Sequence, residues 1–456
     1  MPEPTAPRLG GGFALLWGSS TASALGSGLL TIAAPLLVAT YTDDPVLVSG
    51  AAAVAWLPWL LFALPGGVLV DRVDRRRLML LLVVVRAVAL ALFALAVATG
   101  TSGVLLLYAV LFVGDACEIV MRSASQSLVP EVVPRSLLER ANGWLVGGTT
   151  LTQQLLAGPL GGLLFVLAAA LPFATGAGTY ALSAVLLLLL GARTATGRPA
   201  PVAVGRSVRA DVAEAFRWLL GQRLLRTMAL LIGLLNLTLT AATGVLVLLA
   251  HERLGLGDVG YGLLFGAMAV GGLLGSALGD RIIGWATPTW TVRVGLLVEA
   301  GLHLVLATSR SPLVVGVAFL AFGVHGSLWS IVGASLRQRL TPPEMRGRVI
   351  SSTLFLSAGG NCAGALLGGV AASAFGITAP YWAGFVVAVA VSVATWRTFD
   401  RATVSAAYAD PADAQAGGIP VTDTPSARGT ATVISGPRVA PRSSSSSSPD
   451  QKLPGS

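Results

Sequence analysis

Three ionisable side chains lie close together in one apolar segment of the chain. Asp115, Glu118 and Arg122 stand at positions i, i+3 and i+7, which places them on one face of a helix. An ionisable group in the centre of a membrane-spanning helix costs at least ~2.5 kcal/mol, so each is a functional candidate. Burial favours the protonated form of a carboxylate, which suits a group that loads and releases a proton. We interpret Asp115 or Glu118 as the carrier of an exchangeable proton, with Arg122 tuning it. The alternative is a Glu118–Arg122 pair that only neutralises itself.

Other ionisable residues lie inside apolar segments. Glu299 and His303, at i and i+4, form a second candidate pair, for which contact with lipid or with a structural partner stays open beside proton coupling. His325 titrates near pH 6.5 if exposed to a cavity, or is a hydrogen-bonded structural histidine. Arg86 either reaches a membrane surface or pairs across helices, and we assign it no function. The three histidines are scattered and predict no metal site.

The composition predicts that lipid surrounds most of the chain. Of 456 residues, 54% are hydrophobic and 11% charged, whereas soluble domains carry about 25% charged residues. The net charge of +9 comes from basic residues between apolar runs, which indicates membrane orientation and argues against a nucleic-acid partner. No phosphate-binding glycine loop followed by lysine occurs, so we expect no nucleotide cofactor and a proton gradient as the energy source.

Twelve segments are long and apolar enough to cross the hydrocarbon core as helices, which takes about 20 residues each. The first six are Phe13–Thr40, Val46–Val70, Leu78–Thr99, Val104–Ser127, Ala141–Ala168 and Thr175–Gly191, and the second six are Leu225–Ala250, Gly260–Ile283, Trp290–Thr308, Leu313–Leu336, Val349–Ala374 and Thr378–Trp396. The sequence therefore predicts an all-α polytopic membrane protein.

Arginines on alternate loops predict the orientation and the organisation of the chain. Nearly all lie on one side, and only Arg253 and Arg310 lie on the other, so both termini are expected in the cytoplasm and the protein in the inner (plasma) membrane. The predicted regions are a cytoplasmic tail (1–12), a six-helix bundle (13–191), a cytoplasmic loop (192–224), a second six-helix bundle (225–398) and a disordered cytoplasmic tail (399–456). Within the loop, Ser207 to Leu220 has the pattern of an amphipathic surface helix.

The two bundles repeat each other at an offset of about 208 positions. The matching features, in chain order, are Asp71-Arg72 with Asp280-Arg281, Arg86 with Arg293, Pro134 and Arg140 with Pro342 and Arg348, and Gly161-Gly162 with Gly368-Gly369. Such a duplication around a central path favours alternating access, in which one half rocks against the other.

One loop carries a family resemblance. The stretch Gly67-Val-Leu-Val-Asp71-Arg72-Val-Asp74-Arg75-Arg76 resembles the signature loop between helices two and three of the major facilitator superfamily, although that pattern has a small residue in place of Asp74. The resemblance implies the major facilitator fold, with two six-helix repeats. It also implies a conformational latch, formed here by Gly67, Asp71, Arg72, Arg75 and Arg76 with the repeat-related Asp280 and Arg281. The alternative is charge that sets topology alone.

Two further resemblances concern the direction of transport. Gly158-Pro159-Leu160-Gly161-Gly162 is similar to the end of the superfamily's antiporter motif, although Gln154 stands where a glycine is expected; close helix packing is the alternative. The stretches from Arg122 to Pro130 with Ala141-Asn142, and from Arg346 to Val349, resemble the macrolide-efflux and enterobactin-exporter-like branch.

The family arrangement places helices one, four, seven and ten around a central cavity. The residues that it implies as cavity liners are Asn236, Thr240, His325 and Trp329, then the serines Ser20, Ser23 and Ser27, and Asn361 less strongly. These assignments combine helix identity with side-chain polarity.

We expect a secondary transporter, and not an enzyme, that exports a small amphipathic compound by proton antiport. The compound would be an antibiotic, a secondary metabolite or a siderophore, and the protein would act as a monomer in the lipid bilayer. The alternatives are proton-coupled uptake of a nutrient and, more remotely, a membrane enzyme or a non-transporting membrane protein.

Overall fold

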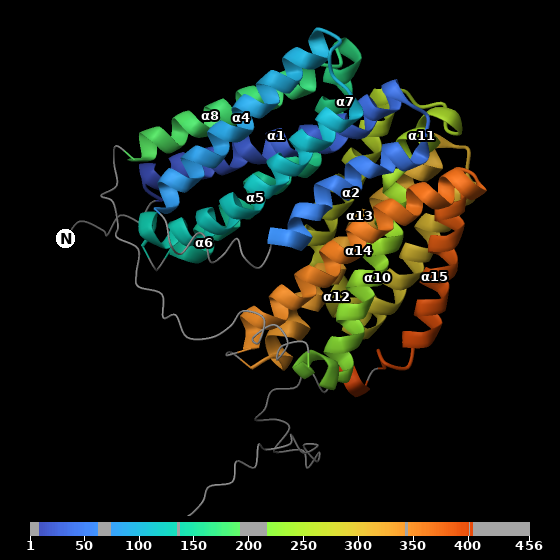
Figure 1. Ribbon diagram of the computed structural model, residues 1–456. Coiled ribbons are helices and arrows are strands. Elements are labelled where there is room, and N and C mark those ends of the chain that lie inside the picture. Colours follow the sequence, from blue (N-terminus) through green and yellow to red (C-terminus); the bar gives the residue numbers. More distant parts are fainter. Residues whose placement is uncertain are drawn as a thin grey trace, which may run out of the picture. The chain divides into compact units, whose positions relative to one another are not determined.

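The computed structural model describes residues 9–62, 74–134, 137–191, 217–342, 345–400 and 402–404, and no strand occurs in these ranges. The helices of the first half are α1 (Gly11–Tyr41), α2 (Pro45–Phe62), α4 (Arg75–Ala98), α5 (Val104–Val132), α6 (Leu138–Thr150), the π-helix η2 (Leu151–Leu156), α7 (Ala157–Leu167) and α8 (Leu171–Gly191). Those of the second half are α10 (Arg223–Gly244), α11 (Leu246–Glu252), α12 (Asp258–Thr308), α13 (Pro312–Leu340), α14 (Arg346–Phe375) and α15 (Ala379–Thr395) (Figure 1).

The described helices accommodate twelve membrane crossings. Ten are long and apolar enough to span a bilayer, with α6, η2 and α7 together forming one of them, and α15 is a shorter apolar helix. At 51 residues, α12 would be about 77 Å long if straight, far more than one bilayer. It breaks at Thr287, whose φ of 66° is non-helical, just before Pro288, so its two arms cross separately. The predicted all-α class with membrane-spanning helices is confirmed.

Several predicted features lie outside the described residues. They are the end of the predicted second span (63–70), the latch residues Gly67, Asp71 and Arg72, most of the predicted amphipathic helix from Ser207 to Leu220, and nearly all of the predicted disordered tail.

The ends of the helices form two faces, which differ in charge. We call one face the arginine-rich end; it holds Arg75 to Arg77 at the start of α4 and Arg337 and Arg339 near the end of α13. We call the other the arginine-poor end; it holds the turns that follow α1, α4 and α14, and among its few arginines is Arg253 after α11. Successive crossings run between these two faces.

One continuous apolar core joins the two halves toward the arginine-poor end. It includes Leu36 and Val48 of the first half, and Tyr261 and Phe319 of the second. The segment Val245–Ala250, where α10 breaks into α11, is buried within it, and none of its residues is more than 3% exposed. This buried segment closes the arginine-poor end with apolar side chains.

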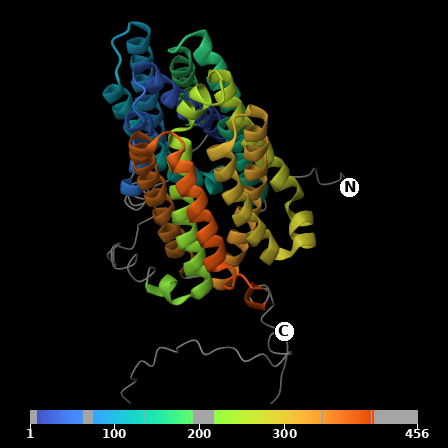
Figure 2. The same cartoon turned by 90° about the vertical axis from the view of Figure 1, so that its right-hand side faces the viewer.

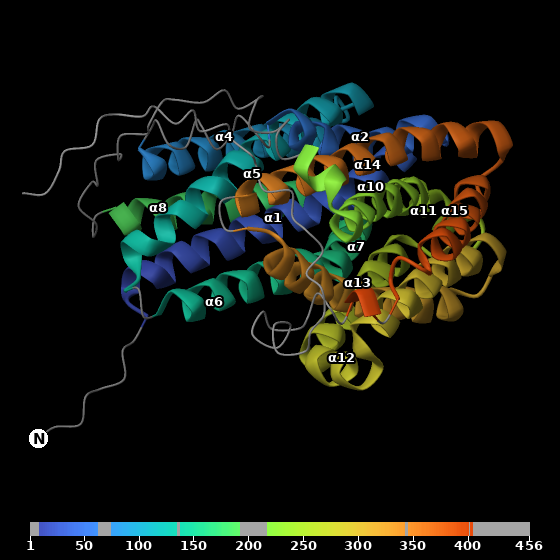
Figure 3. The ribbon, with the colours of Figure 1, turned by 90° about the horizontal axis from the view of Figure 1, so that it is seen from below.

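Toward the arginine-rich end the two halves separate. The contacts between the halves are made mainly by two helix pairs, α2 with α14 and α7 with α12. Figure 1 shows α1, α4, α5, α6 and α8 diverging from α10, α12, α13 and α14, and Figure 3 shows α14 beside both α10 and α2. On the outer side of the second half, α15 runs along α10 (Figure 2). The close contacts between the described helices of the two halves therefore lie toward the arginine-poor end.

Glycines make the contact between α7 and α12 close. A Cβ on Gly158 would lie 2.6 Å from the carbonyl oxygen of Gly262, and one on Gly162 would lie 2.5 Å from that of Asp258. A Cβ on Gly161 would instead lie 3.0 Å from Ile32 of α1, and Pro159 packs against Gly266. The Gly-Pro motif of the predicted fifth span is thus a packing surface toward its own half and toward the other half.

The repeat-related glycines of α14 make the equivalent contacts. A Cβ on Gly368 would lie 2.4–2.8 Å from backbone atoms of Ala241 in α10, within the second half, and so would collide with them. A Cβ on Gly369 would lie 2.8 Å from the carbonyl oxygen of Pro45, where α2 of the first half begins. In each pair the first glycine packs within its own half and the second packs across the interface, as an internal two-fold repeat requires.

Gly162→Ala is expected to open the arginine-poor end. Its methyl group would collide with the backbone of α12 at Asp258, so α7 and α12 must move apart. The measurement is labelling of a cysteine introduced at the buried position Val247 by a membrane-impermeant maleimide. Labelling should rise several-fold in the Gly162→Ala background.

The matched control is Gly178→Ala on α8, where a Cβ would meet nothing within 4 Å. It should leave labelling at position 247 unchanged. Equal labelling in the two backgrounds would contradict the assignment of Gly162 to the closure.

Candidate functional site: a buried arginine network in the first half

Arg86 of α4 stands at the centre of a polar network between four helices. It is 4% exposed, and its Nη1 donates to Glu118 Oε2 of α5 at 2.5 Å and to Ser23 Oγ of α1 at 3.1 Å. Its Nη2 donates to Ser27 Oγ of α1 at 2.8 Å and to the Tyr180 hydroxyl of α8 at 2.5 Å. Both terminal nitrogens of the guanidinium are thus used, while Nε has no hydrogen-bond partner.

Tyr180 and the serines show why this arginine can be buried. The guanidinium carbon lies 4.1 Å from the centre of the Tyr180 ring, so the ring contributes a cation–π contact in addition to the hydroxyl. Ser23 and Ser27 stand one turn apart on α1 and are small enough to bring that helix close. An isolated charge would be expelled from an apolar bundle, and these partners with Glu118 offset that cost.

Arg86 was not predicted to be a site residue, although the sequence carries a signal for it. An arginine deep in an apolar span requires an anionic partner. Asp115 and Glu118 are the carboxylates inside the predicted spans of the first half. The sequence gives the depth of each residue along its helix, but it does not give the rotation of α4 that turns Arg86 toward α5.

Glu118 and Asp115 differ in their surroundings. The Glu118 side chain is 22% exposed and forms the ion pair with Arg86. Asp115 lies one turn earlier on α5, is partly exposed, and interacts electrostatically with both Arg86 and Glu118. In the part of the chain that the structure describes, no hydrogen bond or ion pair to its carboxylate is found. Glu118 thus pairs directly with the buried guanidinium, whereas Asp115 lies near it without a bond to it.

The sequence had suggested a possible pair between Glu118 and Arg122, but the two residues do not pair in the structure. Its side chain is exposed, and its guanidinium carbon lies 5.9 Å from the ring of Trp59 on α2. Arg86 holds the Glu118 carboxylate from a neighbouring helix, and Arg122 lies near Trp59 of α2 instead. The alternative of a self-neutralising Glu118–Arg122 pair is therefore wrong.

The polar residues proposed as cavity liners in the second half tie α10 to α14. Asn236 Nδ2 donates to Ser357 Oγ at 3.0 Å, and the buried Thr240 donates its hydroxyl to Asn361 Oδ1 at 2.6 Å. Thr240 and Asn361 are 6% and 4% exposed, so they lie within the helix contact rather than on its surface.

His325 lies in a second buried cluster, among side chains of the second half. Its Nε2 lies 3.9 Å from Glu299 Oε2, and its ring packs beside Phe322 and Trp329. His303 Nε2 lies 3.6 Å from Glu299 Oε1, and all three ionisable side chains are at most 7% exposed. Glu299 therefore lies against protein partners and not against lipid, two possibilities that the sequence had left open. The described residues contain no group of three His, Cys, Asp or Glu side chains that could hold a metal ion.

The described latch residues, Arg75, Arg76, Asp280 and Arg281, lie at the arginine-rich end, where Asp74 is their neighbour in the chain. Asp74 caps α4 by accepting a hydrogen bond from the backbone nitrogen of Arg77 at 2.9 Å. Arg76 donates to the carbonyl oxygens of Leu187 and Leu188 at the end of α8, a favourable place for a cation. Asp280 and Arg281 are exposed on the first arm of α12.

Comparison with known proteins adds a family and a set of similar folds. The family model described as "Major Facilitator Superfamily" matches residues 16–365. No curated protein matches the chain at a significant level.

Solved structures of low sequence identity share the fold. A nucleoside transporter NupG mutant has a TM-score of 0.69 and 12% identity, covering 86% of this chain and 100% of that chain. A bacterial homologue of the iron transporter ferroportin in an inward-facing state has a TM-score of 0.68 and 16% identity, over 85% of this chain and 98% of that one. A bacterial homologue of the human lysosomal transporter Spinster, inward-facing and unoccupied, has a TM-score of 0.64 and 16% identity, covering 87% of this chain and 96% of that chain.

Proposed function

The chain belongs to the major facilitator superfamily and is therefore a transporter rather than an enzyme. We propose that it exports a small amphipathic compound in exchange for protons. The observation that carries the proposal is a second carboxylate, Asp115, one turn from Glu118, which alone forms the ion pair with the buried Arg86. One carboxylate is needed to neutralise the arginine. The other is an additional charge that a proton can remove.

Asp115 is the better candidate for the exchangeable proton. Glu118 is fixed by its ion pair, so its protonation would leave a buried guanidinium without a counterion, at high cost. Asp115 has no comparable bond among the described residues, and its protonation leaves the Arg86–Glu118 pair intact. Proton loading at Asp115 therefore changes the net charge of the network without breaking it.

We further propose that the arginine-rich end faces the cytoplasm. Positively charged loops remain on the cytoplasmic side of the inner membrane, so both termini would lie there. The separation of the halves at this end then corresponds to an inward-open state, and the buried segment Val245–Ala250 corresponds to the closed outer gate. Export would begin with substrate entering this opening.

The closure between the halves supports a rocking movement. Close glycine contacts occur at both interfaces, α7 with α12 and α2 with α14, near the outer gate. Contacts of small residues between rigid helices can open and close without repacking large side chains. In the outward-open state the two halves would meet at the arginine-rich end, where the latch residues Arg75, Arg76, Asp280 and Arg281 lie. Each half holds a complete bundle, so one chain is a sufficient unit and we propose a monomer.

Export in place of uptake is supported by the resemblance of Gly158 to Gly162 to an antiporter motif. The test is accumulation of a panel of amphipathic dyes and antibiotics in cells that express the protein. Expression should lower accumulation several-fold for at least one compound, and a protonophore should abolish the difference. Accumulation that rises on expression would contradict export and favour the uptake alternative.

A further inference from the structure

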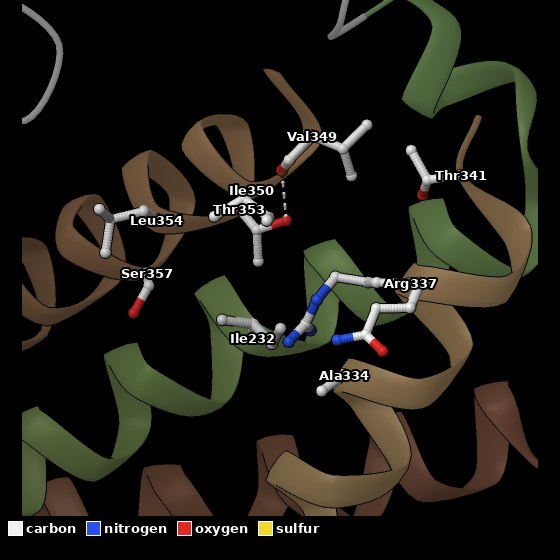
Figure 4. Close-up of a pocket in the computed structure, with 10 residues that line it drawn as sticks. Ile232, Ala334, Arg337, Thr341, Val349, Ile350, Thr353, Leu354 and Ser357 are labelled. Atoms are coloured by element: carbon white, nitrogen blue, oxygen red, sulfur yellow. Dashed lines mark hydrogen bonds between the residues drawn. The ribbon is translucent and has the colours of Figure 1, made fainter. Parts of the chain in front are cut away.

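A pocket lies in the second half at the arginine-rich end, between α13 and α14, with α10 as its floor. Its volume is about 370 Å³, within the range of small-molecule sites. Ile350 and Leu354 of α14 and Ile232 of α10 form its apolar surface, and Ser357 and Thr353 contribute hydroxyl groups (Figure 4). Arg337 of α13 extends into it. The pocket exists because α13 and α14 make few contacts with each other.

Arg337 has no partner of its own in this pocket. No described residue gives its guanidinium a hydrogen bond or an ion pair, and the side chain is partly buried. Other arginines that reach into the helices each donate to an acceptor: Arg86 to Glu118, Arg253 to the carbonyl oxygens of Thr308 and Ser309, and Arg293 to that of Trp396. The Arg337 guanidinium therefore has N–H donors that an anionic ligand in the pocket can accept from.

The surroundings hold the Arg337 guanidinium in place. It folds back along its own helix over Gly333, where an added Cβ would lie 3.3 Å from Nη1 and 3.3 Å from the methyl carbon of Met228. Any side chain at position 333 would crowd this guanidinium. Glycine at this position leaves room for the Arg337 guanidinium, whose N–H donors remain open to the pocket.

Ser357 supplies a second donor. Its Oγ accepts a hydrogen bond from Asn236 Nδ2 at 3.0 Å, so its own hydroxyl hydrogen is available to a ligand. The hydroxyl of Thr353 is engaged, because it donates to the carbonyl oxygen of Val349 at 2.9 Å (Figure 4). The pocket thus combines a guanidinium, the hydroxyl donor of Ser357 and the polar side chains of Gln338 and Thr341 with an apolar wall.

We propose that this pocket binds an amphipathic carboxylate, whose acidic group pairs with Arg337 and whose apolar body lies along Ile350 and Leu354. A guanidinium fits a carboxylate with two parallel hydrogen bonds, which a lysine cannot offer. Ile350 and Leu354 are 58% and 38% exposed, so they offer apolar surface to such a body. The inference rests on the proposed function, because it identifies the exported compound as an acid.

The test is binding to the purified full chain in phosphatidylcholine nanodiscs, with 11-(dansylamino)undecanoic acid as the fluorescent probe. The acid should bind at least ten times more tightly than its neutral methyl ester. Arg337→Gln should weaken binding of the acid about tenfold or more and leave the ester unchanged. Arg337→Lys, which keeps the charge but loses the paired geometry, should fall between.

Arg339→Gln, two residues further on the same helix and not among the pocket residues, is the matched control and should bind the acid as the wild type does. Equal affinity for acid and ester, or an unchanged affinity in Arg337→Gln at unchanged thermal stability, would overturn the proposal. Nanodiscs that contain phosphatidylglycerol test the source of the anion. Competition by this lipid that depends on Arg337 would make the pocket a lipid-headgroup site and overturn its assignment to the exported compound.

The binding assay uses no proton gradient and no transport. Arg337-dependent binding of the acid without any effect on cellular accumulation would therefore contradict the proposed export, and would leave the pocket assignment standing. Proton-coupled export of neutral compounds alone would support the proposed export and would contradict the assignment of the pocket to an exported acid.

Discussion

Replacing Arg86 by methionine is expected to destabilise the protein by about 3 to 5 kcal/mol, because it leaves Glu118 without its cation in an apolar bundle. It also removes the donors that hold Ser23, Ser27 and Tyr180 around α4. The measurement is the free energy of unfolding in mixed micelles, or the midpoint of thermal unfolding where unfolding is irreversible.

The double variant Arg86→Met/Glu118→Leu distinguishes the cost of leaving one buried charge unpaired from the cost of removing the whole ion pair. It should be more stable than either single variant, since apolar side chains of similar volume often replace a buried ion pair at little cost. Arg122→Met, the same change at an exposed site on α5, should cost less than about 1 kcal/mol. Single-variant losses that simply add in the double variant would show that Arg86 and Glu118 do not interact.

Asp115→Asn is expected to uncouple transport from protons while leaving the fold intact. The amide cannot exchange a proton, and the Arg86–Glu118 ion pair remains. Transport driven by a pH gradient should fall at least tenfold, whereas exchange of labelled for unlabelled substrate at equal pH should continue. The measurement compares these two rates in proteoliposomes for the same variant.

Asp43→Asn, which changes an exposed carboxylate at the arginine-poor end, is the matched control and should keep both rates. Full pH-driven transport in Asp115→Asn would contradict the assignment of the proton to this residue. If Asp115→Asn and Glu118→Gln were both fully active, the network would have no role in coupling.

The sequence predicts the fold well because lipid imposes simple rules. A span must be helical, apolar and about 20 residues long, so α1, α4, α8 and α13 begin and end within a few residues of the predicted ranges. The break of α12 was also predictable, since Pro288 separates two apolar runs. The π-helix η2 inside the fifth span was not predicted, because one additional residue per turn leaves no mark on an apolar pattern.

The candidate site was predicted only in part, because its contacts depend on helix rotation. Asp115 and Glu118 were found from their cost in a membrane, and the structure gives Glu118 the cation Arg86. Arg122 was assigned to them by spacing on one helix, and a partner from a neighbouring helix proved closer. His325 was assigned to the cavity from the identity of its helix, whereas its ring lies toward Glu299 inside the second half. Polarity and depth are readable from a sequence; the direction of a side chain around its helix depends on packing.

The most direct test of proton-coupled export is proton flux caused by substrate in proteoliposomes that enclose a pH-sensitive dye. A compound identified from the cellular accumulation panel is added on the side of the arginine-rich end, without a membrane potential. Proton antiport through Asp115 predicts proton movement opposite to the substrate, in proportion to substrate transport and absent in Asp115→Asn. Proton movement in the same direction as the substrate, or substrate transport without any proton movement in the wild type, would contradict it.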